Sequence, residues 1–171
     1  MKKNEGLSLI ELVVVIAIMS VMIAVVGISV TVLSRQKVSN AASDVKSLLQ
    51  TAQTIAMSKD NCHVEIQEIG DSVVFTTYSS SNKIIDKVTL DEKITVSLSY
   101  ASGSSMNMNV LGAVGIYYKR ESGAFDSAYV CGTTGNPKSG TAVDPIRWIR
   151  FSNGNKSVTL HLTELTGKVS Y

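Results

Sequence analysis

Few side chains in this sequence have a type and spacing that could support catalysis. Cys62 and His63 are adjacent, and a thiol beside an imidazole is a pair that nucleophilic catalysis uses. In a β-strand, however, adjacent side chains point to opposite faces, so these two groups could not cooperate. The only other histidine, His161, is expected to face solvent, and neither histidine has the spacing of a metal-binding motif such as H-E-x-x-H. We therefore predict a protein that is not an enzyme and that uses no cofactor and no metal.

A lone carboxylate, Glu11, is the most informative charged group of the chain. It stands at the start of an apolar run, because residues 12–33 include no charged side chain. As an α-helix this run is about 33 Å long, close to the roughly 30 Å of the hydrocarbon core of a bilayer. A carboxylate in hydrocarbon costs about 2.5–3.5 kcal/mol on insertion scales. The charge of Glu11 therefore needs a compensating partner.

The element that must position Glu11 is a long helix. No proline occurs in residues 7–59, and Gly27 is the only glycine there, which predicts one continuous helix over that range. Its first half is apolar on all sides, whereas its second half carries an apolar stripe with steps of three and four residues, typical of a helix that packs on a core. The stripe consists of Val38, Ala41, Ala42, Val45, Leu48, Leu49, Ala52, Ile55 and Ala56.

From Cys62 onward the hydrophobic period changes to two, which is typical of half-buried strands. We predict strands around residues 64–66, 73–77, 94–100, 115–119, 146–151, 157–162 and 168–171. Asn153-Gly154 suits a type I′ hairpin turn, and Ser, Gly, Asn and Thr accumulate in 101–109 and 132–144, which indicates surface loops. The sequence thus predicts an α+β fold in which a long N-terminal helix packs on an antiparallel β-sheet head.

The start of the chain resembles a known family. Gly6-Leu7-Ser8-Leu9-Ile10-Glu11, after a short basic leader and before the apolar run, is similar to the class III signal of type IV pilins and pseudopilins. The resemblance implies that prepilin peptidase, a membrane aspartyl peptidase, cleaves between Gly6 and Leu7 and that the new N-terminus at Leu7 is methylated. The chain departs from the usual pattern in having Leu7 where the family usually has phenylalanine, and Glu5 just before the cleavage position.

The resemblance also suggests a partner for Glu11. If Leu7 becomes the N-terminus, its α-amino group lies one helical turn from Glu11, and in a bundle of such helices Glu11 could pair with the amine of a neighbouring subunit. Such a pair is favourable only when both charges are in place, so it could fix the axial register between subunits during assembly. The alternative is a single-subunit anchor in which Glu11 simply lies at the bilayer interface.

Two further segments resemble the GspH/FimT-type minor pilins and pseudopilins. In residues 40–66 a helix rich in small residues runs into the first strand, and the closing strand pair ends in Gly167-Lys168-Val169. The resemblance implies a pilin-like fold, other pilin subunits as partners in a homo- or hetero-filament, and an assembly platform protein and ATPase. It also implies a single-pass location in the cytoplasmic membrane before assembly and an extracellular or periplasmic filament afterwards.

These inferences divide the chain into a leader peptide, 1–6, a transmembrane and filament-core helix, 7–34, and a globular head, 35–171, in which the helix continues to about residue 59. The predicted function is that of a structural subunit, a minor pilin or pseudopilin, of a type IV pilus, a type II secretion system or a competence pseudopilus. A membrane-anchored exported domain that never assembles is an alternative.

Two features of the head leave alternatives open. Cys62 and Cys131 are the only cysteines, and outside the membrane they could form a disulfide or remain two buried thiols. Acidic residues concentrate in 60–92 and basic residues in 138–171, which could dock neighbouring heads or could be ordinary solvated surface.

The basic segment also offers a second function. Arg147, Arg150 and Lys156 could contact phosphates, and Trp148 could stack on bases, so the head could be a filament-borne binding module for DNA or a surface, as in FimT-like DNA uptake. The alternation of Trp148 with Ile146 instead predicts that the indole belongs to the core.

Overall fold

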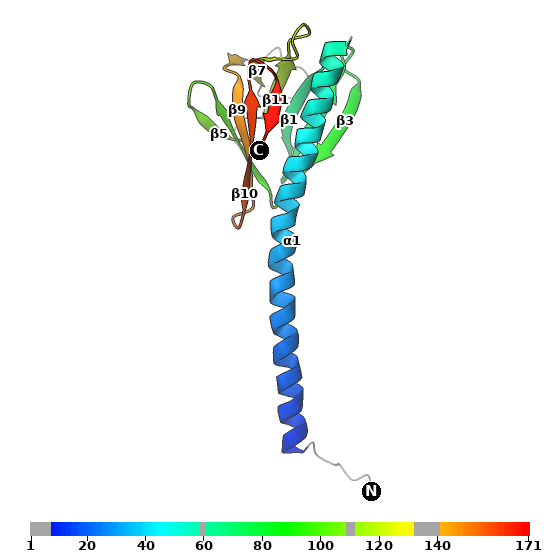
Figure 1. Ribbon diagram of the computed structural model, residues 1–171, viewed down its shortest axis with the longest axis vertical. Helices are drawn as coiled ribbons and strands as arrows, with labels where there is room; N and C mark the ends of the chain where they lie inside the picture. The colour runs from blue at the N-terminus through cyan, green and yellow to red at the C-terminus, as the bar shows by residue number, and fades with distance from the viewer. Residues whose placement is uncertain (1–7, 59–60, 109–111, 132–140) are drawn as a thin grey trace.

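One long helix organises the molecule. The computed structural model describes residues 8–58, 61–108, 112–131 and 141–171. Helix α1, Leu9–Ser58, is continuous, as the absence of proline predicts. Its 50 residues form a rod of about 75 Å at 1.5 Å per residue. The lower half of the rod projects from the head, and the upper half lies against it (Figure 1).

Within the described residues, eleven strands form two antiparallel sheets. The six-stranded sheet has the order β3-β2-β1-β6-β7-β8, with β1 at His63–Ile69, β2 at Ser72–Tyr78, β3 at Ile84–Thr89, β6 at Ala113–Tyr118, β7 at Phe125–Cys131 and β8 at Thr141–Val143. The five-stranded sheet has the order β11-β10-β9-β4-β5, with β4 at Thr95–Tyr100, β5 at Ser105–Asn107, β9 at Ile146–Ser152, β10 at Ser157–Thr163 and β11 at Lys168–Ser170. The α+β, pilin-like fold is therefore confirmed, with two sheets in the head where a single sheet was predicted.

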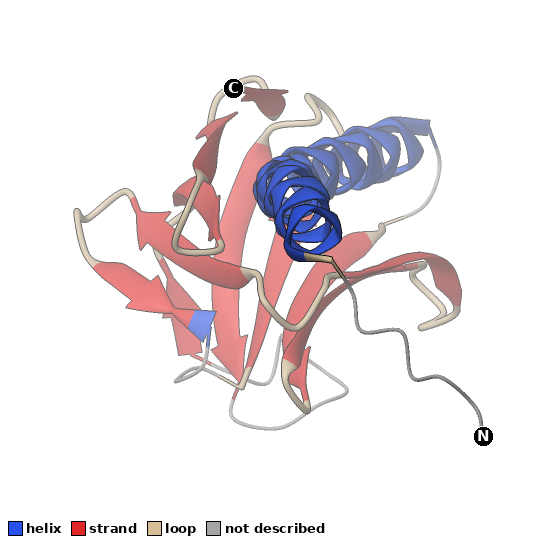
Figure 2. Ribbon diagram, turned by 90° about the horizontal axis from the view of Figure 1, so that it is seen from below, coloured by secondary structure: helices blue, strands red, loops and turns tan. Residues whose placement is uncertain are grey.

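The predicted apolar stripe is the helical side of the hydrophobic core. All of its members are buried except Ile55, which is partly buried and packs against the core. Helix α1 contacts β1, β2 and β3 of one sheet and β9, β10 and β11 of the other, and Figure 2 shows the strands of the head beside the helix. Phe75 of β2 and Phe151 of β9 meet with ring centroids 6.1 Å apart. The two sheets and α1 therefore share one core.

The strands that the sequence did not predict lack a clear alternation of apolar and polar residues. β3, β5 and β8 are edge strands whose side chains are mostly exposed on both faces, so burial imposes no period on them. β7 is internal, but Asp126 and Ser127 interrupt its apolar pattern. The predicted loops 101–109 and 132–144 accordingly contain β5 and β8, while residues 132–140 lie outside the described residues.

The predicted hairpin between β9 and β10 is confirmed, but the predicted turn type is wrong. Ser152 pairs with Ser157, so residues 153–156 connect the strands. Only Gly154 of these residues has a positive φ, 81°, whereas a type I′ turn needs two. Asn153 instead accepts hydrogen bonds through Oδ1 from the backbone N–H groups of Asn155 and Lys156, at 3.2 and 3.1 Å.

A close contact between two turns joins the sheets beside α1. Gln53 Nε2 donates hydrogen bonds to the carbonyl oxygens of Gly123, at 3.0 Å, and Thr166, at 2.8 Å. Gly123 precedes β7, and Gly167, which follows Thr166, precedes β11. The backbones are so close that a Cβ added to Gly167 would lie 1.9 Å from the carbonyl oxygen of Gly123. Only glycine fits here without a shift of the backbone.

Candidate assembly site on the projecting helix

Large apolar side chains cover the projecting part of α1. Every side chain from Leu9 to Ile23 is exposed. The large apolar ones in this stretch are Leu9, Ile10, Leu12, Val13, Val14, Val15, Ile16, Ile18, Met19, Val21, Met22 and Ile23. A soluble monomer rarely exposes a contiguous apolar patch of more than a few hundred Å². This surface therefore needs an apolar environment, which the head does not provide.

Glu11 takes part in a capping box at the start of α1. Ser8 is the N-cap residue, and its Oγ accepts a hydrogen bond from the backbone N–H of Glu11 at 3.3 Å. In return, Glu11 Oε2 accepts a hydrogen bond from the backbone N–H of Ser8 at 2.8 Å. The reciprocal pair satisfies two donors that the first turn of a helix leaves without partners. Sequence reasoning missed this local role, although Ser8 and Glu11 fit the S-x-x-E signature.

Two further predictions concern this segment, the processing of the N-terminus and a membrane span. Gly6 and Leu7, the predicted cleavage and methylation positions, lie outside the described residues. A transmembrane segment was predicted over residues 7–34. Among the residues that the structure describes, no helix is long and apolar enough to qualify as a membrane span.

Contacts near the base of the head fix it on the helix. Lys37 Nζ and Asp91 Oδ2 form an ion pair at 2.6 Å, and this hydrogen bond lowers the pKa of Asp91. Asn153 Nδ2 donates a hydrogen bond to the carbonyl oxygen of Ser34 at 2.7 Å. Higher up, the buried Tyr118 hydroxyl donates to the carbonyl oxygen of Leu49 at 3.0 Å, and burial raises the pKa of Tyr118 well above its ordinary value. The projecting helix therefore holds a defined position relative to the head.

The structure corrects the prediction that Trp148 belongs to the core. Trp148 lies half-buried on the outer face of the five-stranded sheet, with the Arg150 guanidinium carbon 4.9 Å from its ring centroid. Arg150 Nε also donates a weak hydrogen bond to Thr159 Oγ1 of β10 at 3.3 Å. Arg147 is exposed near the start of β9, whereas Lys156 lies beyond the other end of this strand, in the β9–β10 loop. The three predicted phosphate contacts are thus spread along one strand and its loop.

The sheet register separates the two cysteines. The Cys62 thiol is buried and donates a hydrogen bond to the carbonyl oxygen of Ala52 at 2.8 Å. The next residue, His63, pairs with Tyr117 at one end of β6, whereas Cys131 pairs with Ala113 at the other end. Along β1 this separation is about 16 Å, at roughly 3.3 Å per residue, and a disulfide needs Cα atoms within about 7 Å. This register does not fit a bond between the two cysteines of one chain.

The two histidines lie in different surroundings. His63 stacks between the rings of Tyr78 and Tyr117, at centroid distances of 5.4 and 4.9 Å, on the side of β1 opposite the Cys62 hydrogen bond. His161 is exposed on the outer face, as predicted. In the described part of the chain, no group of three His, Cys, Asp or Glu side chains is placed to hold a metal ion.

The acidic cluster is weaker in the structure than in the sequence. Glu65 is buried, with 4% of its surface exposed, and Asp91 is paired with Lys37. Asp60 lies outside the described residues. Fewer acidic groups are therefore available at the surface for docking a neighbouring head than the sequence count suggests.

Comparison with known proteins identifies the N-terminal segment. Residues 1–27 match the family model of the prokaryotic N-terminal methylation motif. The match includes Ser8 and Glu11 and the beginning of the exposed apolar helix, and it supports the resemblance to type IV pilins and pseudopilins. Neither a curated protein nor a solved structure matches the chain.

Proposed function

We propose that the chain is a structural subunit, a minor pilin or pseudopilin, of a type IV pilus, a type II secretion system or a competence pseudopilus. The observation that carries the proposal is the projecting part of α1, exposed and apolar on all sides, with one carboxylate at its start, inside the segment that matches the methylation motif. Such a surface is stable when equivalent helices of other subunits cover it.

The geometry supports different roles for the two halves of α1. Among the helix residues whose side chains the structure describes, Val38 is the first buried one, and the residues that α1 contributes to the core, Val38 to Ala56, lie in its upper half. The lower half is free to pack with other copies, while contacts such as Lys37–Asp91 keep the head in place at the junction. The motif match is consistent with a membrane-anchored precursor that prepilin peptidase processes. The platform protein and ATPase belong to the proposal through the family resemblance alone.

We further propose that the chain is most like the GspH/FimT-type minor pilins and pseudopilins. This assignment rests on the small-residue helix that leads into β1 and on the closing pair β10–β11 with its Gly167-Lys168-Val169 end. Gly167 packs tightly on Gly123, which explains why a glycine stands at the start of the Gly167-Lys168-Val169 end.

The first test of the proposed function is the intact mass of the protein extracted from membranes. We expect a chain that has lost Met1–Gly6 and carries one added methyl group on Leu7. Expression of a Gly6→Val variant provides the control, because blocking the cleavage position should leave the full leader attached. A wild-type chain that keeps Met1–Gly6 and still forms filaments would contradict the proposal, and one that keeps it and never assembles would instead indicate a plain membrane anchor.

A second candidate function is DNA binding by the outer face of the five-stranded sheet. One observation favours it, because Trp148 and Arg150 point outward together rather than into the core. The expected signature is an affinity of the full chain for duplex DNA that falls by about tenfold or more between 50 and 200 mM salt, and that weakens in Arg150→Ala. An affinity that is absent or insensitive to salt excludes this candidate.

A further inference from the structure

Strands β9 and β10 separate at one end of the outer face. Their ladder runs from the Ser152–Ser157 pair to the Trp148–His161 pair and stops there. β9 nevertheless begins at Ile146, and β10 continues to Thr163. Each strand end is still paired with its other neighbour in the sheet. Ile146 of β9 pairs with Tyr100 of β4, and Thr163 of β10 pairs with Lys168 of β11. The two facing strand edges therefore diverge from each other while each stays in the sheet.

A β-bulge at Arg147 accounts for this separation. Along β4 and β9 the register pairs Ser99 with Trp148 and then Tyr100 with Ile146, which leaves Arg147 as an extra residue in β9. A bulge bends its strand and redirects side chains, and bulges are frequent beside functional sites. Here the bulge turns Ile146 into the core, with 3% of its surface exposed, and places Arg147 outside.

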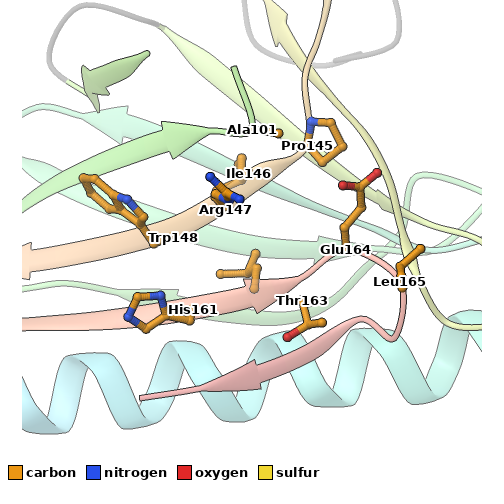
Figure 3. A pocket seen from close by; sticks show the side chains of 10 residues that line it. Ala101, Pro145, Ile146, Arg147, Trp148, His161, Thr163, Glu164 and Leu165 are labelled. Atoms are coloured by element: carbon orange, nitrogen blue, oxygen red, sulfur yellow. The ribbon is translucent and has the colours of Figure 1, made fainter. Parts of the chain in front are cut away.

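The separation leaves a cleft of about 630 Å³. Trp148 and His161 lie at its closed end, and Glu164 and Leu165 lie at the other (Figure 3). Ile146 and Leu162, both buried, also line it and supply apolar surface, and Leu165 at the rim is 84% exposed. Among the described residues, the side chains of Arg147 and Glu164 form no ion pair. A cleft of this size, with apolar surface and a few polar groups, has the character of a ligand site.

We propose that this cleft binds a short, extended, acidic peptide segment. Two diverging strand edges offer main-chain hydrogen bonds to an extended chain, as in β-strand addition, and the apolar lining can receive an apolar side chain. Arg147 lines the cleft, and the Arg150 guanidinium lies against the Trp148 ring at its closed end, whereas Glu164 is the one carboxylate among the lining residues. Two guanidinium groups against one carboxylate favour an acidic side chain of the ligand, held by a charge-assisted hydrogen bond to the Arg147 guanidinium. A nucleic acid fits less well, because a sugar-phosphate backbone cannot form the main-chain hydrogen bonds with the strand edges that an extended peptide forms. The site lies in the head and is independent of assembly through α1.

Fluorescence polarisation with the full chain in detergent tests the proposal. The probe is a pool of fluorescein-labelled, end-blocked hexapeptides in which Asp or Glu alternates with Val, Ile, Leu or Phe, and the control pool carries Lys at every acidic position. We expect the acidic pool to bind at least about tenfold more tightly than the Lys pool, and Arg147→Glu to weaken acidic-pool binding by about tenfold or more, as expected for the loss of a charge-assisted hydrogen bond. Lys87→Glu on the distant edge strand β3 makes a similar change of charge and should have less than about a twofold effect.

A variant that binds more tightly than the wild type provides a control for misfolding. Glu164→Lys removes the one carboxylate of the rim and should tighten acidic-pool binding several-fold, a result that loss of structure cannot imitate. Equal binding of both pools, or wild-type affinity in Arg147→Glu, overturns the proposal. Displacement of the bound peptides by a single-stranded oligonucleotide at much lower concentration also overturns it, and assigns the cleft to nucleic acid instead.

Discussion

Gly167→Ala is expected to lower the free energy of unfolding of the head by about 3–5 kcal/mol, at the upper end of what single substitutions cause. Gly167 has a φ of 63°, where an L-residue with a Cβ costs about 1–2 kcal/mol. The new Cβ would also lie 1.9 Å from the carbonyl oxygen of Gly123 and 2.5 Å from Gln53 Nε2. Because the closest atom belongs to the backbone, the two turns must move apart, and the hydrogen bonds of Gln53 to both turns are then weakened.

The chain contains a matched control for this variant. Gly70 has the same φ, 63°, but a Cβ there would have no atom within 4 Å. Gly70→Ala should therefore cost only the conformational term, about 1–2 kcal/mol, so the difference between the two variants measures the contact between the turns. Urea unfolding followed by the fluorescence of Trp148, the only tryptophan, reports on the head. Equal losses in the two variants would contradict the close contact. Adding Gln53→Ala to Gly167→Ala should not restore stability, since the Gly123 carbonyl remains.

The features of the fold that depend on local periodicity could be predicted from the sequence. The stripe from Val38 to Ala56 has helical spacing and is the face of α1 that the core buries. The internal strands β9 and β10 alternate because each buries one face and leaves the other more exposed. β1 and β2 were also found from their alternating sequence, although the structure buries both of their faces over most of their length. The exposed edge strand β3 has no such constraint and could not be recognised.

Features that depend on pairing between distant segments could not be predicted. The alternation of Ile146 with Trp148 predicts one shared face, but the bulge at Arg147 places the two side chains on opposite faces. The bulge follows from the register between β4 and β9, which single-strand periodicity does not contain. For the same reason the cleft between β9 and β10 and the position of Cys131 far from Cys62 emerged only from the sheet order.

The candidate site is the opposite case, because its local pattern is present in the sequence itself. Ser8 and Glu11 have the spacing of a capping box, so the sequence predicts a hydrogen-bonding role for the carboxylate beside its need for an opposite charge. In the structure Glu11 already accepts a hydrogen bond from its own chain. Two roles for Glu11, helix capping and pairing with a neighbouring amine, must therefore be separated by experiment.

Glu11→Gln is expected to separate them by abolishing assembly while preserving the helix. A glutamine side chain keeps an oxygen that can accept the hydrogen bond from the Ser8 N–H, and capping boxes use Glu or Gln at this position. It removes only the charge, so in a filament the amine at Leu7 of a neighbour would be buried without its partner. Breaking a buried pair in this way costs about 3–5 kcal/mol, which corresponds to a loss of incorporation of about a hundredfold or more.

Ser8→Ala makes the reciprocal change. The substitution removes the hydroxyl that accepts a hydrogen bond from the Glu11 N–H, and it keeps the Glu11 carboxylate. The loss of the N-cap side chain costs about 1 kcal/mol of helix stability. Incorporation should therefore fall less than about tenfold. Both variants are compared by quantitative immunoblotting of sheared filaments from the native host, with intact mass of the membrane fraction as a control that cleavage and methylation are unchanged. If Glu11→Gln assembles at the wild-type level, or if Ser8→Ala is equally defective, then capping of the helix, and not the charge, is what assembly requires of Glu11.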